Sequence, residues 1–238
     1  MAETLRVATV PALAAVRGLV HGFERRLGPS GWEERSASRA RVASALSPRG
    51  RLYLLKQVHG TTVHSAPWEG RPEGDAAVAD RAGILLGIET ADCMPVLVAD
   101  PARRAVAAAH AGWRGTAAGA ARAAVEALLR GGSRAGDLVA ALGPSIGACC
   151  YEVGDELREK FGPGGDAFFH PGPRGRPHLD VRAANVAQLE AAGLPEANIH
   201  HVLDCTSCRA DLYHSYRRDG PRSGRMISYI GWEAPAGG

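Results

Sequence analysis

The stretch RAVAAAHAGWRGTAAGAARAAVEALLRGG, residues 104–132, predicts a buried strand that leads into a helix. The residues before His110 are mostly small or apolar, which is typical of a strand covered on both faces. After Gly115 the apolar residues follow helical spacing, with Thr116 as the expected N-cap and a Gly-Gly pair as the stop. A purely structural histidine needs no Gly-Trp-Arg-Gly so close behind it, so His110 is a candidate metal ligand or catalytic group.

Strand-like and helix-like segments alternate on both sides of this unit, which favours an α/β class with a compact, sandwich-like mixed sheet. We expect a single domain over residues 1–238, although the periodicity leaves the strand order open. The Gly/Pro-rich segment 161–178 is expected to be a surface loop. The expected strands are 51–60, two runs within 82–100, 137–143, 198–205 and 224–232, and the expected helices are 153–161 and 180–193.

The composition is that of an ordinary globular protein, with 22% charged and 45% hydrophobic residues. The formal net charge of +3 gives no reason to expect a nucleic-acid partner. No apolar run is long enough to span a bilayer, and the N-terminal VATVPALAAV lacks a preceding basic cluster. Five cysteines, an odd number, fit a reducing compartment, so we expect a cytoplasmic protein without a membrane partner.

Three possible metal ligands stand just past expected strands or between two of them: His59, Cys93 and His110. Side chains at the ends of neighbouring strands can meet at one rim of a sheet. Two imidazoles and one thiolate suit Zn²⁺, and three protein ligands leave a fourth position open, as in catalytic sites. The spacing alone is not a recognised pattern, and a satisfied core residue is the commoner role for a lone His or Cys.

Two other segments carry weaker signals. In HHVLDCTSC, the residues His201, Cys205 and Cys208 have the short spacings of a structural zinc site. Such a site needs a second pair of ligands, and the adjacent Cys149 and Cys150 lack the usual two-residue gap between paired cysteines. We therefore favour a strand end followed by a turn. GPSIG, residues 143–147, matches a nucleophile elbow literally, but its helix starts too late, which favours a chance match or a ligand-binding turn.

Several catalytic patterns are missing from the sequence. It has no H-x-E with P-C-x-x-C, no H-E-x-x-H, no P-loop and no G-x-G-x-x-G. No H-x-H pair occurs, and nine histidines are few for four copper ions, which argues against a conventional multicopper oxidase.

Seven motifs in a fixed order nevertheless make the chain recognisable from about residue 21 to residue 230. They are KQVHG (56–60), TADCMPVLVAD (90–100), HAGWRG (110–115), GPSIGACCYEVG (143–154), LDVRAANVAQL (179–189), CTSC (205–208) and SYRRDGPRSGR (215–225). Together they resemble the YfiH/laccase-domain family, which includes purine nucleoside phosphorylases and bacterial peptidoglycan editing factors. The chain departs from the family pattern in the segment 21–32, where Glu24, Arg25 and Pro29 replace the usual residues.

The resemblance implies a compact α/β fold of the YfiH/laccase-domain type with a zinc site made by His59, Cys93 and His110. It also implies phosphorolysis of adenosine, inosine and methylthioadenosine, together with adenosine deamination. Zn²⁺ is then the expected cofactor, with Cu²⁺ as the alternative, and the partners are purine nucleosides and phosphate. We expect a monomer or a small homo-oligomer.

Other residues are assigned roles by their chemistry. Asp92, beside Cys93, is the candidate for proton transfer, or alternatively for orienting a ligand imidazole. Arg26, Arg114 and Arg217 are candidates for binding the phosphate dianion, because guanidinium groups form bidentate hydrogen bonds. Ser145 is a candidate substrate contact. The N-terminus of the helix after His110 is expected near the same site, where it would favour an anion.

Three other functions remain open. A His₂Cys site can hold copper, so the chain could be a copper-dependent polyphenol oxidase. A hydrolase acting on peptidoglycan precursors would use zinc to activate water. A zinc-binding interaction protein without enzymatic activity would need a closed four-ligand site.

Overall fold

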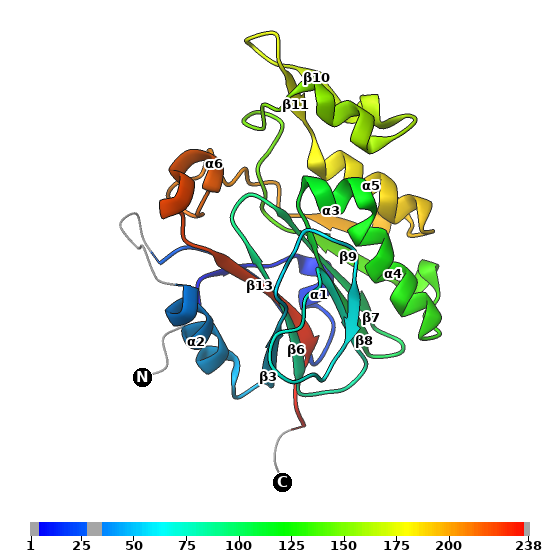
Figure 1. Cartoon of the computed structure of the whole chain (residues 1–238). Coiled ribbons are helices and arrows are strands. Elements are labelled where there is room, and N and C mark those ends of the chain that lie inside the picture. The colour runs from blue at the N-terminus through cyan, green and yellow to red at the C-terminus, as the bar shows by residue number, and fades with distance from the viewer. Residues whose placement is uncertain (1–4, 28–34, 236–238) are drawn as a thin grey trace.

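The computed structural model describes residues 5–27 and 35–235, and two β-sheets packed face to face form its centre. Helices cover the outer faces of both sheets, as Figure 1 shows. Within the described residues, no helix has the length and apolar character needed to cross a membrane.

The first sheet has five strands in the order β1-β2-β13-β6-β3. Strand β13 runs antiparallel to both β2 and β6, whereas β3 is parallel to β6. A strand near the C-terminal end therefore lies at the centre of this sheet, beside one near the N-terminal end. The strands are β1 (Val7–Ala8), β2 (Leu19–Glu24), β3 (Arg51–Leu54), β6 (Ile84–Thr90) and β13 (Met226–Trp232).

The second sheet has six strands in the order β12-β9-β7-β8-β5-β4. Strand β7 is antiparallel to β8 and β9, and the edge pairs β12–β9 and β4–β5 are parallel. The chain passes from the first sheet to the second through residues 91–93, between β6 and β7. The strands are β4 (Val63–Ser65), β5 (Ala76–Ala79), β7 (Met94–Asp100), β8 (Ala105–Ala111), β9 (Val139–Leu142) and β12 (Ile199–His201).

Strand β8, the strand of residues 104–132, is buried along its whole length because both of its faces are covered. One face packs toward the first sheet, where large side chains such as Phe23, Leu86 and Trp232 fill the interior. The other face contacts helix α4 (Ala120–Arg130), and alanines on both elements allow a close approach. The expected α/β class with a mixed sheet is confirmed, with two large sheets rather than one.

The remaining helices lie outside the two sheets. Helices α3 (Trp113–Ala118) and α5 (Val181–Ala191) lie with α4 on the six-stranded sheet, and α2 (Arg35–Leu46) lies on the other sheet (Figure 1). The short helices are α1 (Pro11–Ala14), α6 (Tyr216–Asp219) and the 3₁₀ helices η1 (Ala135–Asp137), η2 (Asp155–Phe161), η3 (Gly165–Phe168), η4 (Glu196–Asn198) and η5 (Gly220–Arg222).

The expected helix start at Thr116 was wrong. Helix α3 begins at Trp113 with Gly112 as its N-cap, and the Thr116 hydroxyl donates to the Ala111 carbonyl at 3.2 Å. Gly119 then adopts a left-handed conformation, with φ of 93°, and separates α3 from α4. The helix therefore begins closer to His110 than the sequence indicated.

Three other boundaries differ from expectation. Strand β3 ends at Leu54 rather than near residue 60. The segment 161–178 contains the hairpin of β10 (Phe169–Pro171) and β11 (Pro177–Leu179) instead of forming only a loop. The helix expected over 153–161 is the 3₁₀ helix η2. In each case tertiary packing or local glycine and proline residues override the periodic signal.

Candidate active site

The structure brings His59, Cys93 and His110 together at one end of the two sheets. His59 lies in the loop after β3, Cys93 is the last residue of the crossing between the sheets, and His110 lies near the end of β8. One ligand atom from each residue lies within 4.8 Å of those of the other two. The two imidazole rings meet edge to face, with 4.8 Å between their centroids. This convergence is what a three-ligand metal site requires.

Asp75, at the start of β5, holds the trio in place. Its side chain is fully buried and accepts a hydrogen bond from His110 Nδ1 at 2.8 Å. It also accepts from the backbone N–H groups of Val58, His59 and Gly60 at 3.1, 2.9 and 2.7 Å. With Nδ1 engaged by the carboxylate, Nε2 is the nitrogen of His110 left for a metal.

The role of Asp75 was missed from the sequence. Asp92 was the residue considered for orienting an imidazole, and the contact with His110 is made by Asp75 instead. The available signal was an aspartate directly before the apolar run AAVA, where a carboxylate is buried at a strand start.

The charges within the trio favour a thiolate. Burial alone would raise the pKa of Cys93, but the neighbouring His110, with a smaller contribution from His59, lowers it to about 6. Burial alone would lower the pKa of His110, yet the Cys93 charge and Asp75 raise it to about 9. Without a metal, the two groups therefore form a thiolate–imidazolium pair at neutral pH, and a metal bound to the thiolate would displace the proton from His110 Nε2.

Two residues of the site adopt a left-handed backbone conformation that non-glycine residues rarely take: His59 has φ of 64° and Asp92 has φ of 89°. The loop of His59 is held by its N–H bonds to Asp75. Asp92 accepts hydrogen bonds from the Thr206 hydroxyl and the Arg217 N–H, both at 2.6 Å. Such strain persists only where surrounding contacts fix it, as they do here.

The surroundings of Gly112 explain why a glycine lies two residues after His110. A Cβ atom at this position would lie 2.8 Å from Cys93 Sγ and 3.2 Å from a carbon of the His59 ring. Contacts this short are not tolerated, so only glycine lets the backbone pass beside both ligands.

Gly112→Ala is therefore expected to displace Cys93 or His59 and to weaken divalent-metal binding about tenfold or more, as misoriented ligands do. Competition of the protein with a chromophoric chelator for Zn²⁺ measures the effect. Gly136→Ala is the matched control, because a Cβ at Gly136 meets no atom within 4 Å. Equal zinc affinities for the two variants would contradict the role given to Gly112.

A cavity of about 730 Å³ opens over the trio, and basic side chains dominate its charged lining. The acidic lining residues are Glu89 and Asp92, and the carboxylate of Glu89 is already paired with Arg39 and Arg71. Such a pocket favours an anionic ligand beside the metal ligands. The basic lining residues are Arg35, Arg39, Lys56, Arg71, Arg114, Arg217 and Arg225.

Three of the side chains expected at the site line this cavity: Asp92, Arg114 and Arg217. The Arg114 guanidinium lies over the Trp113 ring, 4.5 Å from its centroid. The Arg217 side chain donates to the carbonyls of Cys150 and Glu152, at 3.4 and 2.8 Å, which fixes its position.

The two other candidate substrate contacts lie elsewhere. Arg26 donates to the Ala210 carbonyl at 2.9 Å and does not belong to the lining. Ser145 is 1% exposed and pairs with Cys205 through the backbone. Their substrate roles stay predictions. Of the altered segment 21–32, residues 28–32 lie outside the described part of the chain.

The interpretation of Cys205 and Cys208 as parts of a simple turn was incomplete. Their thiols meet those of Cys149 and Cys150, the pair set aside for lacking a gap. His201 lies apart from this group, beside Arg182, with 3.5 Å between their nitrogens.

Comparisons with known proteins agree with this geometry. The family model described as "Multi-copper polyphenol oxidoreductase laccase" matches residues 33–233. A purine nucleoside phosphorylase of Deinococcus radiodurans is 42% identical over 82% of this chain and 76% of its own. The adenosine deaminase RL5, from an unknown prokaryotic organism, is also 42% identical, over 66% of this chain and 61% of its own.

A solved structure has the same fold. YlmD from Geobacillus stearothermophilus superposes with a TM-score of 0.84 at 31% sequence identity, and the match covers 94% of each chain. The relative of that name is called a purine nucleoside phosphorylase.

Proposed function

The chain belongs to the multi-copper polyphenol oxidoreductase laccase family, and from that premise we propose that it is a zinc-dependent purine nucleoside phosphorylase acting on adenosine, inosine and methylthioadenosine. One observation carries the proposal: a strongly basic pocket surrounds a His₂Cys trio. The pocket suits phosphate as a co-substrate, and the names of several relatives agree with it.

The residues present fit a zinc ion. His59, Cys93 and His110 offer two nitrogens and a thiolate within 4.8 Å of one another, and Asp75 fixes the ring of His110. Three protein ligands are the number found in catalytic zinc sites. Bound there, zinc would supply Lewis-acid chemistry close to the substrate.

Arg114 is the residue best suited to hold phosphate. Its side chain is exposed to the pocket and stacks on Trp113, and within the described chain no protein hydrogen bond to its guanidinium competes with a ligand. Arg217 supplies a second positive charge from a fixed position. Two guanidinium groups can neutralise the dianion that attacks C1′ of the ribose as the bond to the base breaks.

Asp92 and Tyr151 are two polar residues that line the pocket. Burial, together with the Cys93 charge, raises the pKa of Tyr151, so its hydroxyl stays protonated and can donate to a substrate. Asp92 accepts two hydrogen bonds, and we keep it as the proposed group for proton transfer to the departing base.

The test is a chromatographic assay of the zinc-loaded protein with inosine, with and without phosphate. The expected result is phosphate-dependent release of hypoxanthine and ribose 1-phosphate. Arg114→Ala should raise the KM for phosphate about tenfold or more, since a hydrogen bond to a charged group contributes about 1.5–3 kcal/mol. Arg122→Ala, which removes a largely exposed arginine paired with Glu126, is the control and should leave this KM unchanged. Absence of phosphorolysis of any nucleoside would refute the proposal.

Adenosine deamination is the second candidate activity, because the relative RL5 is named an adenosine deaminase. The same assay detects it as inosine formed from adenosine without phosphate. A copper-loaded sample with a phenol tests the oxidase alternative, since copper also binds such a ligand set. If neither adenosine deamination nor phenol oxidation is detected, peptidoglycan precursors are the next substrates to assay.

A further inference from the structure

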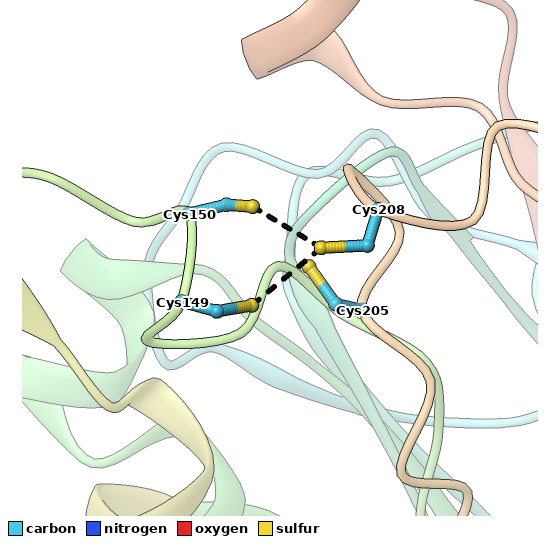
Figure 2. A group of neighbouring side chains, drawn as sticks. All are labelled: Cys149, Cys150, Cys205 and Cys208. Carbon is cyan, nitrogen blue, oxygen red and sulfur yellow. Dashed lines mark hydrogen bonds between the residues drawn. The ribbon is translucent and has the colours of Figure 1, made fainter.

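Four cysteine thiols converge at a second place, apart from the His59, Cys93 and His110 trio. The sulfurs of Cys149, Cys150, Cys205 and Cys208 all lie within 4.8 Å of one another. Figure 2 shows all four side chains pointing to a common centre. We propose that these cysteines bind a structural zinc ion. The inference is independent of the proposed phosphorylase activity.

The spacing of the sulfurs suits a shared metal. Cys208 Sγ lies 3.3 Å from Cys150 Sγ and 3.7 Å from Cys149 Sγ. Four thiolates placed tetrahedrally at the usual zinc–sulfur distance of about 2.3 Å are about 3.8 Å apart. A disulfide would place two sulfurs at about 2 Å. The distances therefore suit ligands around one ion, and a tetrahedral set of four thiolates is typical of Zn²⁺ or of iron.

The backbone around Cys205 is arranged for a thiolate. The Gly147 N–H donates to Cys205 Sγ at 3.3 Å. Gly147 can approach because it has no side chain: a Cβ there would lie 3.3 Å from Cys149 Sγ. A backbone N–H donated to a sulfur stabilises its negative charge, which is the form that ligates zinc.

The two cysteine pairs come from two loops that leave the sheet side by side. Cys149 and Cys150 follow β9, Cys205 and Cys208 follow β12, and these two strands are parallel neighbours. The loops contact again where the Thr206 N–H donates to the Ser145 carbonyl at 3.0 Å. A fully protein-ligated ion has no position for substrate, so it would fasten the two loops together and take no part in the reaction.

The loop after β9 contributes Ile146 and Tyr151 to the lining of the active-site pocket, and the loop after β12 contacts the lining residue Asp92. The carbonyl of Cys150 accepts from the Arg217 guanidinium at 3.4 Å, and the hydroxyl of Thr206 donates to Asp92. The carbonyls of Thr206 and Ser207 both accept from Arg218, at 2.9 and 3.1 Å. Zinc bound to the four cysteines would thus stabilise the positions of Arg217 and Asp92 relative to the trio.

Zinc content of the purified chain, measured by inductively coupled plasma mass spectrometry, tests the site. His59→Ala removes a ligand of the trio, so this variant should retain about one zinc ion, held by the four cysteines. Adding Cys208→Ser to it should remove that ion, whereas adding Ser207→Ala, the adjacent control, should not. Equal zinc in the His59→Ala protein with and without Cys208→Ser would overturn the proposal, as would iron in place of zinc.

A second measurement avoids any change to the cysteines, in case Cys208→Ser does not fold. The His59→Ala chain is loaded with Co²⁺, which reports its ligands by its absorption spectrum. Four thiolates should give intense sulfur-to-cobalt charge transfer and strong visible bands of a tetrahedral site. A spectrum without them, or disulfides among these cysteines in the metal-free purified protein, would overturn the proposal.

Discussion

His110→Ala is expected to remove zinc from the trio and to lower phosphorolysis of inosine about a thousandfold. His110 is 2% exposed, and its imidazole donates directly to the Asp75 carboxylate. Alanine there removes a ligand and leaves Asp75 without its imidazole partner. Loss of metal-ion stabilisation costs several kcal/mol of transition-state energy, and each 1.4 kcal/mol is a tenfold change in rate.

Steady-state kinetics and zinc content measure this result together. His200→Ala is the control, because this histidine lies on the edge strand β12 and does not line the pocket. The control should keep the zinc and the rate of the original protein. Full activity in His110→Ala protein that has lost the zinc of the trio would show that this metal is not needed for the reaction.

Asp75→Asn is expected to lower zinc affinity about 10- to 100-fold, the usual effect of removing the partner of a ligand histidine. The carboxylate accepts four hydrogen bonds in a fully buried position. An amide offers a single oxygen and turns an N–H₂ group toward donors, so the loop of His59 and the ring of His110 both lose support. The protein should also unfold at lower urea concentration.

Asp100→Asn separates the two effects. Asp100 is also buried and accepts one hydrogen bond, from the Arg103 N–H, at the far end of β7. The change there should lower stability without lowering zinc affinity. If both variants lose stability equally and neither loses zinc affinity, Asp75 has only a structural role.

The sequence predicted the metal trio better than the residues around it. The expected strand ends brought His59, Cys93 and His110 into one hypothesis, and the family resemblance gave it its weight, although β3 ends at Leu54, well before His59. The sequence signal for Asp75, an aspartate directly before an apolar run, is much weaker, because three of its four partners are backbone groups of a loop 15 to 17 residues away. Hydrogen bonds to backbone leave no pattern in side-chain spacing.

The four-cysteine cluster was missed for a different reason. The two pairs lie more than fifty residues apart, with Cys208 58 positions after Cys150. They meet because β9 and β12 pair in parallel, and local periodicity carries no information on which strands are neighbours. The same limit left the two-sheet arrangement open, although the existence of most strands was predicted. The single domain over the whole chain stays a prediction.

The central place of β13 sets the order in which the protein can be completed. During synthesis the six-stranded sheet has all of its strands once His201 has emerged, whereas β2 and β6 wait for a partner that comes some twenty-five residues later. Until then both strands present unpaired edges, a state prone to aggregation. Arg217 and Arg225 lie just before β13 in the sequence and emerge shortly before it. A nascent chain therefore acquires all the basic residues of the pocket only when β13 can take its place between β2 and β6.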